Sequence, residues 1–179
     1  MEISIRNYVA GSYLLESDDH PWDAIVILDS TLRESEFVEN NTRNSLFLRF
    51  DDVTTETQGK RSPTVDDVRL ALQFATDSHR LMVCCRAGQS RSAAMAFVIA
   101  YQKMGAETAI GLLNPKRHSP NQLIIDLASA VIDDPAFSTV FHDWLTANSN
   151  IRLIDYVDEI ERELNAIESN GARNRIAQA

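Results

Sequence analysis

The sequence predicts an α/β fold in which helices flank a central, mostly parallel β-sheet. Three short apolar runs indicate strands, at residues 24–29, 45–50 and 81–85. The first run is apolar up to its last residue, which is typical of a strand buried on both faces of a sheet. With 179 residues, of which 44% are hydrophobic and 24% charged, the chain is long enough for one domain with a sizeable core.

The chain is acidic, with a net charge of -9 at pH 7 and a pI near 4.8. Because such a surface repels nucleic acid and anionic membranes, we expect neither as a partner. No run approaches the roughly 18 apolar residues of a membrane helix. Glu2, Arg6 and Asn7 do not suit a secretory signal peptide, so we expect a cytoplasmic protein.

The two cysteines of the chain are adjacent, at Cys84 and Cys85. Adjacent cysteines form neither a disulfide framework nor the ligand spacing of a zinc site. The four histidines are scattered along the chain and form no motif with carboxylates. The sequence therefore predicts no metal and no cofactor.

The most informative stretch is 81–100, where a buried strand, a tight loop and an apolar helix follow one another. Cys85 ends the strand and Arg91 begins the helix. If residues 86–91 curl around a centre, their backbone N–H groups form a nest for an anion, and the helix N-terminus adds partial positive charge. Gly88 gives the turn its conformational freedom, and the planar guanidinium of Arg91 can bind two oxygens of one phosphate.

Cys85 is expected at the base of this loop as a thiolate at neutral pH, because helix N-termini and nearby cations stabilise the anion. Ser92 follows Arg91, and its hydroxyl can donate to the sulfur and ease its departure from a covalent intermediate. These residues point to phosphoryl transfer through a cysteine. A cysteine that only fills the core is the simpler interpretation, but it does not explain the arginines, glycine and serines around it.

The sequence Cys-Arg-Ala-Gly-Gln-Ser-Arg-Ser at 85–92 resembles the signature loop of the cysteine-dependent protein tyrosine phosphatases, in particular the dual-specificity-type and bacterial tyrosine phosphatase-like branch. The resemblance covers roughly residues 24–135. It implies a protein tyrosine phosphatase-like fold, metal-independent phosphomonoester hydrolysis through a phosphocysteine, and catalytic roles for Cys85, Arg91 and Ser92. The residues that it implies in substrate binding are Arg86, Ala87, Gly88, Gln89, Ser90 and Arg91.

A candidate general acid follows the second predicted strand. Asp51 and Asp52 lie where that strand ends, at the start of a loop that runs to Pro63. A carboxylic acid in a mobile loop can protonate a leaving oxygen. By similarity to the family's acid loop, we expect Asp52 to be this acid, with Asp51 as the second choice and otherwise a supporting residue. An Asx turn that closes the strand is the alternative.

Two further positions bear on the loop. The family has histidine before the nucleophile where this chain has Cys84, so Cys85 is expected to ionise less readily than in relatives. Cys84 also suggests a protective disulfide with an oxidised Cys85, although its ring would be strained. The resemblance implies that Asn121 braces the phosphate loop. A helix N-cap is an equally good interpretation of Asn121, and the two roles are compatible.

The remaining segments are predicted from their hydrophobic patterns. Residues 3–15 alternate weakly and break at Gly11, which indicates one or two strands near a sheet edge. We expect 1–135 to form the catalytic domain, 136–168 a helical extension packed on it, and 169–179 a disordered tail. The apolar stripe of 151–167 either packs on the domain or binds a partner or a second copy, and the oligomeric state is not predicted. Helices are predicted within 31–44 and over 64–75 (with Thr64 as N-cap), 91–103, 105–113, 122–133 and 151–167.

The sequence therefore predicts a phosphatase whose substrate is a phosphorylated protein or a small phosphomonoester. Phosphotyrosine, phosphoserine or phosphothreonine, and a small ester all remain open. Two alternatives are a catalytically weak module that holds a phosphorylated protein, and a rhodanese-like sulfurtransferase, which also places a cysteine in a backbone cradle. The pair Arg91-Ser92, with a carboxylate upstream, favours phosphate over persulfide.

Overall fold

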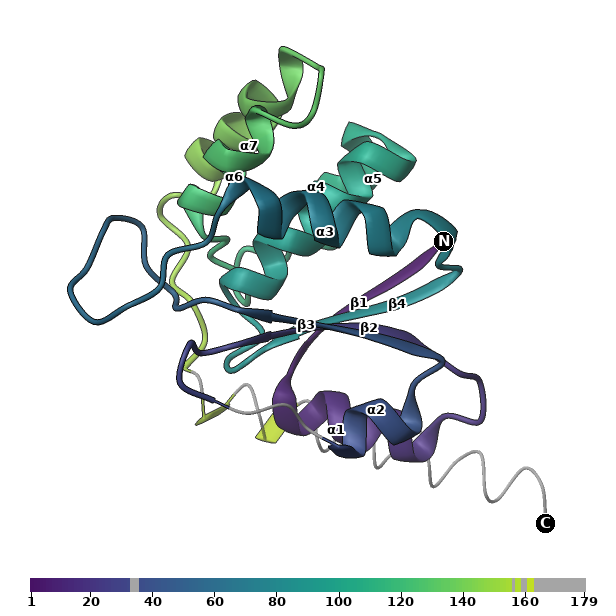
Figure 1. The fold of residues 1–179 in the computed structure, drawn as a ribbon. Helices are drawn as coiled ribbons and strands as arrows, with labels where there is room; N and C mark the ends of the chain where they lie inside the picture. The colour runs from purple at the N-terminus through teal and green to yellow at the C-terminus, as the bar shows by residue number, and fades with distance from the viewer. Residues whose placement is uncertain (33–35, 156, 159–160, 163–179) are drawn as a thin grey trace.

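A four-stranded parallel sheet forms the centre of the molecule, in a computed structural model that describes residues 1–32, 36–155, 157–158 and 161–162 (Figure 1). The strand order is β1–β4–β2–β3, and every neighbouring pair is parallel. The predicted mostly parallel sheet is confirmed, and the three strands expected from apolar runs lie within one residue of their predicted bounds. The strands are β1 (Glu2–Asn7), β2 (Asp23–Leu28), β3 (Asn44–Arg49) and β4 (Arg80–Cys85).

Helices lie on both sides of the sheet (Figure 1). One side carries α1 (Tyr8–Ser17) and α2 (Glu36–Asn41). Because successive strand residues point to opposite faces, the sheet separates a smaller core on this side from a larger core on the other. The other side of the sheet carries α3 (Val65–Phe74), α4 (Arg91–Met104), α5 (Ala106–Leu112), α6 (Gln122–Ser129) and α7 (Ala136–Ala147).

No helix of the described ranges is long and apolar enough to cross a membrane.

Local sequence signals determine where α3 and α4 begin. Thr64 caps α3 as predicted: its hydroxyl oxygen accepts from the Asp67 N–H, and the Asp67 carboxylate accepts from the Thr64 N–H at 2.9 Å. Every residue of α4 from Arg91 to Tyr101 is buried, as its apolar sequence predicts. The N-terminus of α4 is therefore held by packing along most of the helix.

The N-terminal segment differs from the predicted strands over 3–15. β1 does lie at the sheet edge, but it ends at Asn7 and α1 begins at the next residue. The Asn7 side-chain oxygen caps this helix by accepting from the Ala10 N–H at 2.8 Å. Gly11 breaks no strand: it lies inside α1, where an added Cβ would be 3.3 Å from the Met82 sulfur. Close packing of α1 on the sheet explains this glycine.

The C-terminal region departs from the predicted helix over 151–167. Residues 151–155 form no regular secondary structure. The Ile154 N–H donates instead to the Lys116 carbonyl at 2.8 Å, a long-range hydrogen bond that replaces a helical one. Residues 157–158 and 161–162 are helical, and the rest of the predicted helix and the tail 169–179 lie outside the described residues.

Helix α7 contributes aromatic side chains to the larger core. Phe137 and Phe141 are fully buried, and their ring centroids lie 5.7 and 5.4 Å from that of Phe97 in α4. Tyr101 adds an edge contact to Phe137 at 4.9 Å. Buried aromatic rings contribute strongly to core packing, so α7 is joined to the body of the molecule through α4.

Replacement of Phe141 by alanine tests this packing. Because F141A removes a fully buried ring from the cluster, the free energy of unfolding should fall by about 3–5 kcal/mol, as measured by urea denaturation. The exposed Asp143 in the same helix provides the control, and D143A should change that free energy by less than about 0.5 kcal/mol. Equal stability of the two variants would show that α7 does not contribute to the core.

Candidate active site

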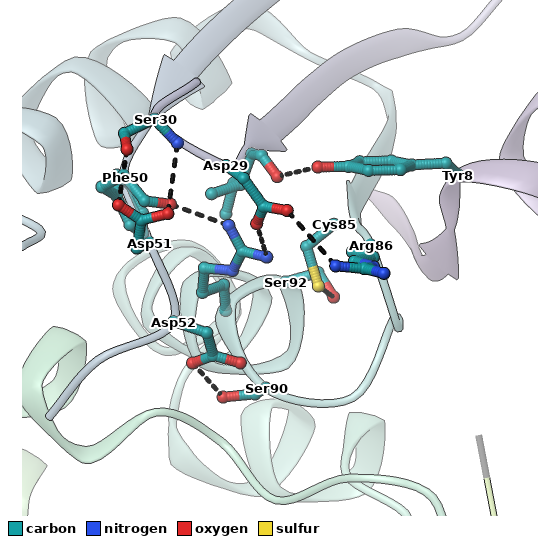
Figure 2. A network of polar contacts seen from close by, with 12 residues as sticks. Tyr8, Asp29, Ser30, Phe50, Asp51, Asp52, Cys85, Arg86, Ser90 and Ser92 are labelled. Carbon is teal, nitrogen blue, oxygen red and sulfur yellow. Dashed lines mark hydrogen bonds and ion pairs between the residues drawn. The ribbon is translucent and has the colours of Figure 1, made fainter. Parts of the chain in front are cut away.

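The carboxyl ends of β2, β3 and β4 meet at one edge of the sheet around a cavity of about 250 Å³ (Figure 2). Parallel strands bring the residues that follow them to a common edge, where α/β proteins bind ligands. A larger hollow of about 510 Å³ within the loop 56–62 is lined by none of the predicted site residues. The smaller cavity is lined by Asp29, Asp51, Asp52, Val53, Lys60, Cys85, Arg86, Ala87 and Arg91.

The loop between β4 and α4 turns tightly at Gly88, which has a φ of +70°. An added Cβ there would lie 2.6 Å from the Asn7 backbone nitrogen, so the loop packs directly on the junction of β1 and α1. Cys85 is buried at the end of β4, and its sulfur lies 3.2 Å from the Ser92 hydroxyl oxygen. The structure thus brings Ser92 within hydrogen-bonding reach of the sulfur.

The Arg91 side chain is only 3% exposed and is held on two sides. Its Nη1 donates to the Phe50 carbonyl at 2.7 Å, and its Nη2 donates to Asp29 Oδ1 at 2.6 Å. Burial alone would lower the Arg91 pKa, but the negative charges of Cys85 and Asp29 outweigh it and raise the pKa above its usual value. Its Nε is buried and has no hydrogen-bond partner in the described structure. A fixed cation therefore keeps one donor unused.

The two candidate acids have opposite environments. Asp52 is exposed, and its Oδ1 accepts from the Ser90 hydroxyl at 2.8 Å and from the Asn121 amide at 2.7 Å. Asp51 is buried and accepts from both the backbone and the hydroxyl of Ser30. The hydroxyl donation, against the opposing effect of burial, holds the pKa of Asp51 below its usual value. Asp51 is thus fixed as an anion, whereas Asp52 reaches the cavity from its rim.

Asn121 makes two kinds of contact, one as a helix cap and one between two loops. Its Oδ1 caps α6 by accepting from the Ile124 N–H at 3.2 Å. Its Nδ2 donates to Asp52 and, at 3.2 Å, to the Val53 carbonyl, while its backbone N–H donates to the Ser90 carbonyl at 3.4 Å. The residue therefore connects the loop of Asp52 to the loop that follows Cys85.

Cys84 does not face the cavity. It belongs to the smaller core, whereas Cys85 belongs to the larger one, because adjacent residues of β4 point to opposite faces of the sheet. Burial, reinforced by Cys85, raises the pKa of the Cys84 thiol far above its usual value. A disulfide between the two would require β4 to distort, so the geometry does not favour the suggested protective bond.

The side chains of the other predicted binding residues, which belong to the loop itself, point in different directions. Arg86 is exposed, with Nη1 3.8 Å from Asp29 Oδ2, and Ala87 lines the cavity. The Gln89 side-chain amide turns away and donates to the Ile154 carbonyl at 3.3 Å. The segment 151–155 thus lies beside the loop between β4 and α4, a contact that no sequence pattern indicated.

Sequence reasoning missed Asp29, Lys60 and Tyr8. Asp29 could have been found, because it directly follows a predicted strand and parallel strands share a ligand-binding edge. Tyr8 donates to the Ile27 carbonyl at 2.6 Å (Figure 2), and burial is the main cause that raises its pKa. Its place depends on α1, which was predicted as strand. Lys60 belongs to a long loop whose path brings its Nζ to 3.7 Å from Asp51 Oδ1. No pattern in the sequence predicts that path.

In the described part of the chain, no group of three or more His, Cys, Asp or Glu side chains is arranged to hold a metal ion. The polar groups around the cavity are instead guanidinium, ammonium, carboxylate, hydroxyl and thiol. Such a set can bind an oxyanion, present a sulfur nucleophile to it and exchange a proton with it.

The solved structures that resemble this chain include those of PTPMT1 and Tk-PTP. The structure of PTPMT1 in complex with PI(5)P is 14% identical, with a TM-score of 0.52 over 79% of this chain and 94% of that chain. A mutant form of Tk-PTP is 15% identical, with a TM-score of 0.51 over 73% of this chain and 89% of that chain. No family model and no curated protein matches the sequence. The likeness concerns the fold, and the chain has the fold of the cysteine-dependent protein tyrosine phosphatases.

Replacement of Gly88 by alanine tests the loop geometry. The new Cβ would clash with the Asn7 backbone, and alanine would have to adopt a left-handed conformation, so G88A should destabilise the protein by about 1–3 kcal/mol. Orthovanadate resembles phosphate, and we expect it to raise the melting temperature of the native protein by binding in the loop. G88A should abolish this stabilisation. Gly111 is the matched control, because it lies in α5 with nothing within 4 Å of an added Cβ. G111A should keep the orthovanadate response, and retention of that response by G88A would contradict the tight-loop account.

Proposed function

We propose that this chain is a cysteine-dependent phosphatase that hydrolyses phosphomonoesters, with a phosphorylated protein as its substrate. The observation that carries the proposal is the meeting of Cys85, Ser92 and Arg91 at the N-terminus of α4, with the Asp52 carboxylate lining the same cavity beside Ser90. The roles below are assigned on this geometry and on the resemblance of 85–92 to the phosphatase signature loop.

In the first step, the Cys85 sulfur attacks phosphorus. A P–S bond forms while the bond from phosphorus to the leaving oxygen breaks, and Asp52 gives its proton to that oxygen. The unused Nε–H of Arg91 and the backbone N–H groups of 86–91 bind the other phosphate oxygens and stabilise their charge in the transition state. The products are the free alcohol or phenol and a phosphocysteine.

In the second step, Asp52 acts as base and takes a proton from a water molecule that attacks phosphorus. A P–O bond forms and the P–S bond breaks, releasing inorganic phosphate. The Ser92 hydroxyl, 3.2 Å from the sulfur, donates to the developing thiolate and makes it a better leaving group. The sequence of steps uses protein groups alone, so activity should persist in a chelator.

The charges around the site favour phosphorylated protein over phosphoinositide. Arg86 is the only cation of the loop besides Arg91, and the neutral Gln89 turns towards Ile154. Three aspartates line the cavity and offset its three cations, Lys60, Arg86 and Arg91, and the chain carries a net charge of -9. A polyanionic headgroup and an anionic membrane would both be repelled. PTPMT1 binds PI(5)P in its crystal structure, but we propose phosphotyrosine, or a dual specificity, for this chain.

Hydrolysis of p-nitrophenyl phosphate in EDTA tests the proposal. C85S should lower kcat/KM by about 10³-fold or more, because the nucleophile is removed. D52A should lower kcat by about 10²- to 10³-fold and flatten the fall in rate at high pH that reports loss of the acid's proton. The exposed D66A in α3 is the control and should match the native enzyme.

A native protein that binds orthovanadate but does not turn over p-nitrophenyl phosphate would favour the alternative of a phosphate-binding module. Turnover of thiosulfate with no turnover of phosphate esters would favour a sulfurtransferase. Comparison of phosphotyrosine and phosphoserine peptides of the same sequence then separates tyrosine specificity from dual specificity.

Replacement of Asn121 by serine tests the support of Asp52. Serine keeps a helix N-cap, so the free energy of unfolding should change by less than about 1 kcal/mol. The amide that donates to Asp52 Oδ1 is lost, and kcat should fall by about 10- to 100-fold because the acid is misplaced. An unchanged kcat in N121S would show that the Ser90 hydroxyl positions Asp52 without help.

A further inference from the structure

We propose that Asp29 is a positioning residue that sets the orientation of Arg91 and so determines the affinity of the cavity for an oxyanion. The proposal rests on the proposed function only in assigning that oxyanion to the substrate phosphate. Asp29 directly follows β2, the strand next to β4, and its carboxylate lines the cavity together with Cys85 and Arg91.

Two contacts fix the geometry of the Arg91 guanidinium. Arg91 has three nitrogens, and two of them are held: Nη2 by Asp29 Oδ1 at 2.6 Å and Nη1 by the Phe50 carbonyl at 2.7 Å. The third, Nε, is buried without a partner in the described structure. Because a guanidinium is planar, contacts at Nη1 and Nη2 fix the direction of the Nε–H. Of the two acceptors, the Asp29 carboxylate is charged and the Phe50 carbonyl is not, so Asp29 makes the stronger contact.

Asp29 also contacts both arginines of the segment 86–91. Its Oδ1 accepts from Arg91, the last residue of the loop, and its Oδ2 lies 3.8 Å from Nη1 of Arg86, the first residue after the nucleophile. Figure 2 shows the Asp29 carboxylate with its dashed contact to the Arg86 side chain. One carboxylate therefore contacts both ends of the loop.

A simpler view makes the opposite prediction. Asp29 is a negative charge within a cavity that receives a negative ligand, so its removal should strengthen anion binding by relieving repulsion. If Asp29 instead holds Arg91 in place, its removal should weaken binding, because the loss of an aligned donor to a charged ligand outweighs the gain. The sign of the change in affinity separates the two accounts.

The experiment measures the binding of tungstate, a tetrahedral oxyanion that is not hydrolysed, by calorimetry in the C85S background, which lacks the proposed nucleophile. C85S/D29A should bind tungstate about 10- to 100-fold more weakly than C85S, the effect of one hydrogen bond to a charged group. C85S/D29N should lie within about threefold of C85S, because the asparagine oxygen still accepts from Arg91 Nη2. Tungstate binding by both double variants as tight as, or tighter than, that of C85S would overturn the proposal.

Kinetics provide a second readout that a loss of stability alone would not move. In the otherwise native protein, D29A should lower kcat/KM for p-nitrophenyl phosphate by about 10- to 100-fold, and D29N should restore most of it. D66A removes an exposed aspartate that pairs with Arg69 and should behave as native. Equal kcat/KM in D29A and D66A would count against the role of Asp29 while leaving the phosphatase function intact.

The two proposals fail in different ways. If the native protein does not hydrolyse phosphate esters but C85S/D29A still loses tungstate affinity relative to C85S, Asp29 positions Arg91 in a site that only binds. Asp29 is partly exposed, with a side chain 23% accessible, so D29A should fold, and circular dichroism with a thermal melt confirms this before either assay.

Discussion

The burial of Arg91 beside Cys85 is the constraint on which the rest of the site depends. The guanidinium of a residue that is 3% exposed needs its charge and its donors satisfied by the protein. The Phe50 carbonyl at the end of β3 and the Asp29 carboxylate after β2 do this, and α4 begins at Arg91 itself. One side chain thus joins three segments that are distant in sequence. The parallel strand order makes this contact geometrically available, because it brings those carboxyl ends together.

The same edge gives two adjacent aspartates different chemistry. Asp51 is buried under donors from Ser30 and the Arg61 backbone, which stabilise its anion and anchor the start of the long loop. Asp52, one residue later, takes no part in these contacts. Its side chain is exposed, and only its Oδ1 accepts hydrogen bonds, from Ser90 and Asn121. A carboxyl group that must gain and lose a proton is better placed at the second position than at the first. The environment therefore supports our proposal that Asp52, and not Asp51, is the general acid.

Local patterns in the sequence were sufficient where the structure is determined locally. The uninterrupted apolar runs located β2, β3 and β4, and Thr64 located the start of α3, because its cap depends on a residue three positions away. Prediction failed where contacts between residues distant in sequence determine the local structure. Gly11 looked like a strand break but accommodates the Met82 sulfur of another element, and the apolar spacing after residue 151 looked helical although Ile154 bonds to Lys116. Asp29 was overlooked because its neighbours in space come from β4 and α4.

Both ends of the described chain contact the loop between β4 and α4. Gly88 packs on the backbone of Asn7, and Gln89 donates to the Ile154 carbonyl, so one loop of a few residues contacts segments almost 150 positions apart. Aromatic packing of α7 on Phe97 fixes the chain between these contacts. We infer that residues 136–155 fold together with the sheet, because the loop geometry that Arg91 and Cys85 require is stabilised from that side as well. The active-site loop is then a product of the whole fold, and the signature at 85–92 is only its most visible part.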